Sequence, residues 1–155
     1  MPSSFTSLTY HIVFSTKFRK RWLTDNLRND LYVYLLGIIA NKGGQLLEIG
    51  GTEDHIHLVT TCSPKMALSD FVRDIKANSS RWVRDEKGEQ DFNWQTGYGA
   101  FTVSYSRVDA TREYVRNQQE HHKARSFKEE FRAILERHGI TFNEEYLFED
   151  DYDDR

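Results

Sequence analysis

The sequence predicts an α+β fold, a ferredoxin-like split βαβ sandwich with an antiparallel sheet and an added C-terminal helix that bears a tyrosine. The expected elements follow the order strand, helix, strand, strand, helix, strand, and a further helix comes after the last strand. Two helices have apolar stripes that can cover one face of the sheet, whereas the last helix is polar on nearly all sides. The 155 residues suffice for about one domain.

The first elements begin with residues 8–15, a run of β-branched and aromatic side chains that is typical of a strand. Thr24 or Asp25 can cap a helix that extends to residue 41, because apolar side chains recur along it at helical spacing. Residues 45–49 are then expected to form a short second strand.

The next elements complete the sheet. Residues 50–51 are two glycines, which we expect to turn the chain into a third strand over residues 55–61. An amphipathic pattern predicts a second helix over residues 66–85. Residues 86–99 are polar and rich in glycine, as loops are, and residues 100–106 read as the fourth strand.

The last expected helix, residues 109–125, has an unusual composition. Its apolar or aromatic residues are Ala110, Tyr114, Val115 and Ala124. A helix without an apolar stripe is not held by its own hydrophobic face. We therefore expect a partner chain, a polar site or nucleic acid to fix its position.

Charge is unevenly distributed along the chain. The net charge is −3, but residues 144–155 contain seven acidic residues and one basic residue, so the remainder is mildly basic. This predicts one domain over residues 1–147 with an acidic tail at 148–155, and it is compatible with a nucleic-acid partner. No apolar run approaches the length that spans a bilayer, and the single cysteine, Cys62, suits a reducing cytoplasm.

Two histidines stand on the expected third strand. Because alternate side chains of a strand point to opposite faces, His55 and His57 share one face, and Ile56 and Leu58 share the other. Two imidazoles two residues apart on a strand form half of a metal site. Two unrelated histidines on a half-exposed strand would give the same pattern.

Basic side chains gather in two segments. Residues 16–22 interleave four cations with two aromatic rings, a composition that suits single-stranded nucleic acid because rings stack on bases and cations bind phosphates. A basic stripe also lies along one side of the second helix. Solvated surfaces have the same appearance. The candidate DNA contacts are Lys17, Arg19, Lys20, Arg73, Lys76 and Arg84.

Tyr114 and Gln118 lie four residues apart and therefore on one face of the last helix. With the two histidines, the amide oxygen of Gln118 could hold Mg²⁺ or Mn²⁺, and two imidazoles would also accept zinc. Tyr114 beside such an ion would be a nucleophile, although a tyrosine here could also be a lone core anchor. His121 and His122 are neighbours on the expected helix and cannot both face the site, so we interpret them as solvated or DNA-contacting.

These motifs match a known family. His55-Ile56-His57 after Asp54, and Tyr114-Val115-Arg116-Asn117-Gln118 before the second histidine pair, resemble the single-tyrosine HUH transposases of small bacterial and archaeal insertion sequences. Residues 10–17 are similar to the family's first strand. Residues 97–101 and 137–140 are similar to its branch related to the REP-associated tyrosine transposases.

The resemblance implies specific properties. Such enzymes bind single-stranded DNA with hairpins and attack it with tyrosine, which leaves a 5′-phosphotyrosine and a free 3′-hydroxyl. It implies that His55, His57 and Gln118 are metal ligands, that the metal is Mg²⁺ or Mn²⁺, and that Tyr114 is the nucleophile. It also implies a homodimer with the active site shared between chains, in the cytoplasm, associated with the nucleoid.

Three other interpretations compete with this one. A domesticated relative would process chromosomal repeat hairpins without moving an element. A sheet of the same topology that binds RNA or DNA without catalysis would need no metal and would leave Tyr114 and Gln118 unexplained. A two-histidine phosphoesterase would need a second histidine motif on another strand, which the sequence lacks.

Overall fold

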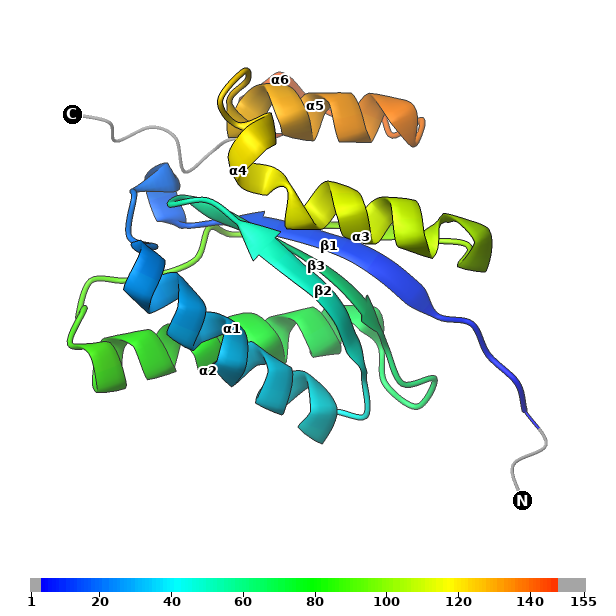
Figure 1. Cartoon of the computed structure of the whole chain (residues 1–155), viewed down its shortest axis with the longest axis horizontal. Coiled ribbons are helices and arrows are strands. Elements are labelled where there is room, and N and C mark those ends of the chain that lie inside the picture. The colour runs from blue at the N-terminus through cyan, green and yellow to red at the C-terminus, as the bar shows by residue number, and fades with distance from the viewer. Residues whose placement is uncertain (1–3, 148–155) are drawn as a thin grey trace.

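The computed structural model describes residues 4–147 and confirms the α+β sandwich. A four-stranded antiparallel sheet has the order β2-β3-β1-β4 and lies between two layers of helices (Figure 1). The predicted acidic tail at 148–155 lies outside the described residues. The strands are β1 (Thr9–Ser15), β2 (Leu46–Gly51), β3 (His55–Thr61) and β4 (Gly99–Thr102).

The first face of the sheet is covered by α1 (Asp25–Asn41) and α2 (Leu68–Lys87), as the apolar stripes predicted (Figure 1). Thr24 caps α1, since its side-chain oxygen accepts a hydrogen bond from the Leu27 N–H. Strand alternation sends one set of central-strand side chains into this layer, where they are fully buried: Ile12, Phe14, Ile56 and Leu58.

The second face is covered by α3 (Val108–Arg116), α4 (Gln118–His121) and α5 (Phe127–Arg137) (Figure 1). The sequence interpretation did not include α5. Its apolar side chains form a second core with the other set of strand residues: Val13, Phe101, Phe127, Phe131, Ile134 and Leu135. The remaining short helices are η1 (Lys17–Arg19), η2 (Tyr105–Arg107) and α6 (Glu144–Leu147).

The expected turn at Gly50 and Gly51 was wrong, because both glycines belong to β2. A Cβ atom on Gly50 would lie 2.0 Å from the carbonyl oxygen of Val115, so only glycine lets α3 come this close to the sheet. The turn into β3 lies in the three residues that follow β2.

Two other boundaries differ from expectation. The strand predicted over residues 100–106 ends at Thr102, and η2 occupies part of its expected length. The helix predicted over residues 109–125 is divided at Asn117, whose backbone leaves the helical region at φ −97° and ψ 26°. This break separates α3 from α4 and changes the directions in which the later side chains point.

Contacts within its own chain hold α3 in place, so of the three expected causes neither a partner chain nor nucleic acid is needed. Val115 is fully buried and packs against Gly50 of β2. Arg112 and Arg116 reach the carboxylate of Glu48 on β2 at 3.4 and 3.0 Å. One buried valine, one glycine and two ion pairs replace the missing stripe. The homodimer with a shared site remains a prediction.

Among the described residues, no helix combines the length and the apolar character that crossing a membrane requires.

Candidate active site

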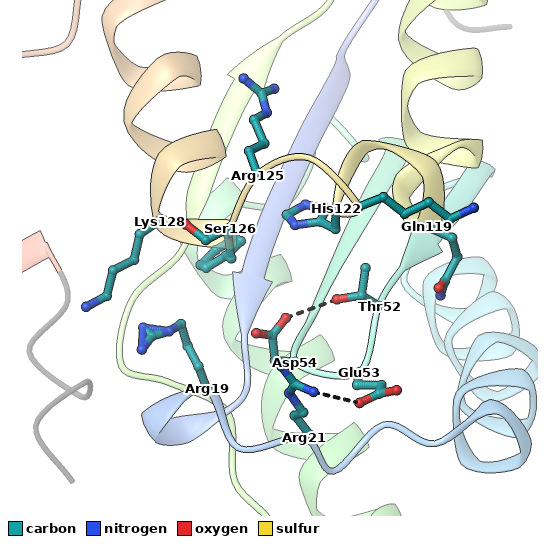
Figure 2. Close-up of a pocket in the computed structure, with 12 residues that line it drawn as sticks. Arg19, Arg21, Thr52, Glu53, Asp54, Gln119, His122, Arg125, Ser126 and Lys128 are labelled. Carbon is teal, nitrogen blue, oxygen red and sulfur yellow. Dashed lines mark hydrogen bonds and ion pairs between the residues drawn. The ribbon is translucent and has the colours of Figure 1, made fainter. Parts of the chain in front are cut away.

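The candidate site lies on the second face of the sheet, where β3 begins. A pocket of about 630 Å³ opens beside it between the β2–β3 turn, the segment after β1 and the connection from α4 to α5 (Figure 2). Asp54 and His122 line this pocket and also contact groups inside the protein. The pocket therefore leads from solvent to the histidines.

His55 and His57 are fully buried on one face of β3, as strand alternation predicted. Each ring has a partner on its Nδ1 atom. The Asp54 carboxylate lies 2.7 Å from Nδ1 of His55, and Nε2 of His11 on β1 lies 2.7 Å from Nδ1 of His57. Such partners fix the orientation of each ring and direct its Nε2 toward Gln118 or Glu130.

Burial keeps His57 and His11 neutral at pH 7. It lowers the pKa of His57 to about 4 and that of His11 to about 3. Burial raises the pKa of Asp54, but its hydrogen bonds with His55 and Thr52 and the nearby histidines together outweigh this effect and leave the pKa below its usual value. A neutral imidazole with a lone pair is the form that binds metal ions.

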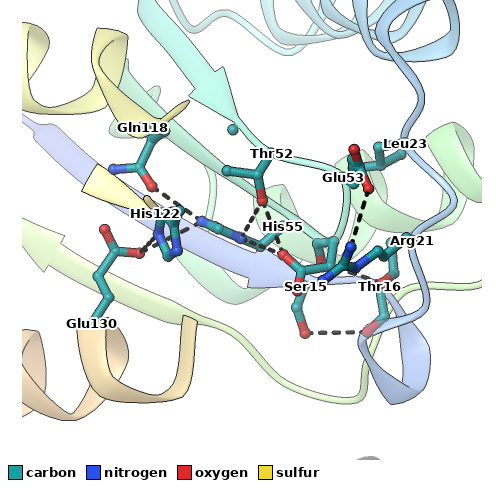
Figure 3. Close-up of polar contacts among 12 residues, drawn as sticks. Ser15, Thr16, Arg21, Leu23, Thr52, Glu53, His55, Gln118, His122 and Glu130 are labelled. Atoms are coloured by element: carbon teal, nitrogen blue, oxygen red, sulfur yellow. Dashed lines mark hydrogen bonds and ion pairs between the residues drawn. The ribbon is translucent and has the colours of Figure 1, made fainter. Parts of the chain in front are cut away.

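Acceptor atoms face one another around His55. The Asp54 carboxylate accepts the Nδ1 proton of His55, and on the opposite side of the ring Nε2 lies 3.1 Å from Oε1 of Gln118 and 3.5 Å from Oε1 of Glu130 (Figure 3). Two acceptor oxygens that converge on one imidazole nitrogen leave a place for a proton or a cation among them. The donor set thus fits a metal ion.

Glu130 on α5 is the centre of this cluster. Its buried Oε1 accepts hydrogen bonds from Nε2 of His57 at 2.9 Å and of His122 at 3.0 Å. Burial alone would raise its pKa, but these bonds outweigh burial and hold the pKa well below the usual range. The ligand atoms of Glu130, His55 and His122 lie within 4.8 Å of one another, so this cluster could bind a metal ion.

Tyr114 reaches the same carboxylate. Its hydroxyl donates a hydrogen bond to Oε2 of Glu130, and an Arg125 guanidinium nitrogen donates to the hydroxyl oxygen at 3.3 Å. Burial, followed by the charge of Glu130, raises the pKa of Tyr114 to about 12. The phenol is therefore protonated at neutral pH. The Glu130 carboxylate connects its oxygen to His57 and His122, because all three side chains hydrogen-bond to it.

The interpretation of His121 and His122 as solvated was wrong, as was the argument that both cannot face the site, whereas their contact with DNA stays a prediction. His122 bonds to Glu130, and the His121 ring stacks on Tyr114 with ring centres 4.6 Å apart. Both can face inward because the chain leaves the helix at this point: α4 ends at His121.

The predicted DNA contacts lie in two places. Arg19 lines the pocket of Figure 2, and the ammonium groups of Lys17 and Lys20 lie over the Phe18 ring at 5.4 and 5.8 Å. The α2 cations line a different pocket of about 570 Å³. There Lys76 donates to two loop carbonyls, Arg84 donates to Phe92, and Arg73 pairs with Asp70 and Asp74.

The sequence interpretation missed Glu130, although the residues just before and around it contain a pattern that could have revealed it. Ser126 and Glu129 form a capping box, in which the Ser126 oxygen accepts the Glu129 N–H, and an apolar stripe follows. Glu130 lies within that stripe. A charged residue on the buried face of a helix needs a partner, and this signals a polar site.

Comparison with known proteins begins with a family model. Residues 4–118 match the family described as "Transposase IS200 like". The ISDra2 transposase TnpA of Deinococcus radiodurans is 27% identical over 117 residues, which cover 72% of this chain and 84% of the relative. The transposase for insertion sequence element IS200 of Salmonella typhimurium is 29% identical over 120 residues, or 74% of this chain and 78% of the relative.

Solved structures are also similar. One is a Deinococcus radiodurans protein described as a transposase, with a TM-score of 0.63 and 25% identity over 76% of this chain and 95% of that chain. Another is a REP-associated tyrosine transposase bound to a REP hairpin, with a TM-score of 0.54 and 13% identity over 74% and 70%. At that identity the second likeness concerns the fold alone. Residues 119–155, and with them Glu130, lie beyond the family match.

Proposed function

The chain belongs to the IS200-like transposase family, and we propose that it cleaves and rejoins single-stranded DNA with Tyr114 as the nucleophile. One observation carries this proposal. The Tyr114 hydroxyl and the Nε2 atoms of His57 and His122 all hydrogen-bond to the carboxylate of Glu130, so the phenol and the histidines share one centre.

We propose that His55, His57 and Gln118 bind Mg²⁺ or Mn²⁺, and that Glu130 and His122 add to the donor set. The lowered pKa of His57 and the acceptor oxygens that converge on His55 Nε2 support this assignment. A divalent ion held there supplies positive charge that polarises phosphate oxygens and stabilises the charge that develops on them.

The proposed reaction has two transesterification steps. The Tyr114 oxygen forms a bond to phosphorus, the bond from phosphorus to the 3′-oxygen breaks, and the tyrosine proton passes to solvent while the leaving oxygen gains a proton from water. The products are a 5′-phosphotyrosine and a free 3′-hydroxyl. In the second step a 3′-hydroxyl attacks the phosphotyrosine, which rejoins DNA and releases the phenol.

Two contacts prepare the chain for this chemistry. Glu130 accepts the Tyr114 proton in a hydrogen bond and so sets the direction of the hydroxyl. Arg125, in the connection from α4 to α5, donates a hydrogen bond to the same tyrosine oxygen, and its positive charge can also contact a phosphate of the DNA.

We further propose that the DNA carries hairpins. The REP-associated tyrosine transposase of similar fold is bound to a REP hairpin, and the motifs of this chain resemble its family branch. The test is to incubate single-stranded oligonucleotides from the DNA that flanks the gene with protein and Mn²⁺, and to separate covalent adducts on a denaturing gel. Adduct with Mn²⁺, and none with chelator or with Tyr114→Phe, supports the proposal. Full cleavage in excess chelator contradicts the metal assignment.

A homodimer with a shared site is the family expectation, but the single-chain geometry supports a second arrangement. Tyr114 lies against the histidines of its own chain, with ring centres 6.0 Å from His57. The two are distinguished by mixing His57→Ala chains with Tyr114→Phe chains under conditions of subunit exchange. A shared site recovers up to about half of the activity per mixed dimer, whereas a site within one chain stays inactive.

A further inference from the structure

The pocket beside the site is lined by segments that are distant in sequence. Arg19 and Arg21 follow β1, Asp54 lies in the β2–β3 turn, and Arg125 and Lys128 come from the α4–α5 connection and α5 (Figure 2). Folding alone brings them together. Of the lining residues, Arg125, Lys128 and their neighbours lie beyond the part of the chain that matches the family model.

Positive charge dominates this pocket. Five of its lining residues are cations and two are carboxylates. Asp54 is occupied with His55 at 2.7 Å, and Glu53 lies 3.9 Å from Arg21. The cations therefore exceed the acids by three, in a cavity large enough for a ligand. The cations are Arg19, Arg21, Lys123, Arg125 and Lys128.

The pocket is connected directly to the reacting groups. Arg125 donates to the Tyr114 hydroxyl oxygen at 3.3 Å, and His122 bonds to Glu130. Tyr114 itself lines a separate pocket of about 410 Å³, so Arg125 links the two. A strand whose phosphate sits at Tyr114 can place a neighbouring phosphate within reach of Arg125. Free phosphate or a nucleotide would satisfy the charge equally well, but neither explains why Arg125, which lines the pocket, also contacts the tyrosine hydroxyl.

The loop that presents Arg19 has an unusual backbone. Phe18 and Arg19 both have positive φ, 58° and 52°, a conformation that non-glycine residues rarely adopt. The backbone contacts of Thr16 with Asp54 and of Lys17 with Asn93 hold the loop in place. Arg19 is thus directed to the pocket by packed structure rather than by chance exposure.

We propose that this pocket binds the phosphate backbone of the DNA strand directly beside the scissile phosphate. The proposal rests on the proposed function and extends it, because it names the surface that holds the substrate. It also places the main backbone contact beside Tyr114 rather than on α2, whose cations line a different pocket.

Two variants test the pocket, each removing two cations without touching Tyr114 or a candidate metal ligand. They are Arg19→Gln with Lys128→Gln, and Arg21→Gln with Lys123→Gln. The matched control is Lys42→Gln with Lys65→Gln. Lys42 follows α1 and Lys65 follows β3, at the end of the sheet opposite to His55.

Binding of a fluorescent single strand that spans the cleavage point is measured in chelator, so that no variant cleaves. Each phosphate contact on a single strand contributes about 0.7 to the slope of log K against log salt. Each pocket variant should therefore lower the slope by about 1.4 and weaken binding about 25-fold at 0.1 M salt, while the control keeps wild-type values. Thermal unfolding midpoints establish that every variant is folded.

A second arm locates the contact along the strand. The oligonucleotide is shortened one nucleotide at a time on either side of the cleavage point. On one side, shortening should weaken wild-type binding but leave the pocket variants unchanged, because they have already lost those contacts. Additive losses on both sides overturn the proposal.

Other outcomes also overturn it. If both pocket variants bind DNA with wild-type affinity, the pocket is excluded as the backbone-binding site. If the control variant loses as much affinity as the pocket variants, the binding reflects only general attraction to a basic surface. Competition by inorganic pyrophosphate or a mononucleotide as effective as the strand itself assigns the pocket to a small anion. Because binding is measured without cleavage, absence of a covalent adduct would contradict the proposed function and leave this test unaffected.

Discussion

Gly50 is where α3 comes closest to the sheet, and Gly50→Ala tests whether this approach positions Tyr114. The new Cβ would lie 2.0 Å from the Val115 carbonyl oxygen, whereas ordinary contacts begin at 3.4 Å, so helix and strand must separate by roughly 1.4 Å. Tyr114 immediately precedes Val115 and moves with it. A displacement of about 1 Å can cost about 10²-fold in rate, and forced packing costs about 1–3 kcal/mol of stability.

The assay compares initial rates of adduct formation and urea unfolding of the same preparations. Gly37→Ala is the matched control, because no atom lies within 4 Å of its added Cβ and α1 should gain up to about 1 kcal/mol. We expect Gly50→Ala to remain folded and to lose about 10²-fold or more in rate, with the control unchanged. A folded Gly50→Ala protein with wild-type rate would show that the packing of α3 on β2 does not place the nucleophile.

Four further predictions concern the centre itself. His57→Ala should abolish cleavage but keep hairpin binding in a gel-shift assay, and parallel loss of both would point to unfolding instead. Tyr114→Phe should form no adduct while its unfolding midpoint stays near wild type; a persistent adduct would assign another nucleophile. Glu130→Gln should weaken Mn²⁺ binding in titration calorimetry because a carboxylate charge is lost, with exposed Glu136→Gln as control, and unchanged affinity would exclude Glu130 as a ligand. In chelator, the free energy of unfolding should fall as pH drops from about 6.5 to 4, by up to about 1.4 kcal/mol per pH unit for each of His57 and His11. The reason is that these histidines bind protons in the unfolded chain but stay neutral when buried in the folded chain. A flat profile would contradict their lowered pKa values.

Periodicity predicted the sheet, its first helical layer and the shared face of His55 and His57. These features depend on local spacing, since alternation along β3 decides which side chains point away from α1 and α2. The four-residue spacing from Tyr114 to Gln118 also indicated one site, and the structure brings Gln118 to 3.1 Å from Nε2 of His55. Their roles stay predictions.

The features that were not predicted depend on contacts between distant segments. Gly50 looks like a turn residue until α3 is placed above it. Asn117 interrupts a pattern that reads as one continuous helix, and the early end of α4 at His121 lets two adjacent histidines face the site. Glu130 receives its partners from β3, α3 and the residue after α4, so its place in an apolar stripe signals a polar site but does not identify those partners.

Identification of the residue that carries DNA tests the proposed function most directly. Wild-type protein is allowed to react with Mn²⁺ and the single-stranded substrate, digested with nuclease and trypsin, and analysed by mass spectrometry. Cleavage after Arg112 and Arg116 isolates Tyr114 in a four-residue peptide. The expected result is a nucleotide phosphate on this peptide, formed with the divalent ion and absent in chelator. A nucleotide on Tyr98 or Tyr105, or strand cleavage without any modified tyrosine, would contradict the assignment of Tyr114 as the nucleophile.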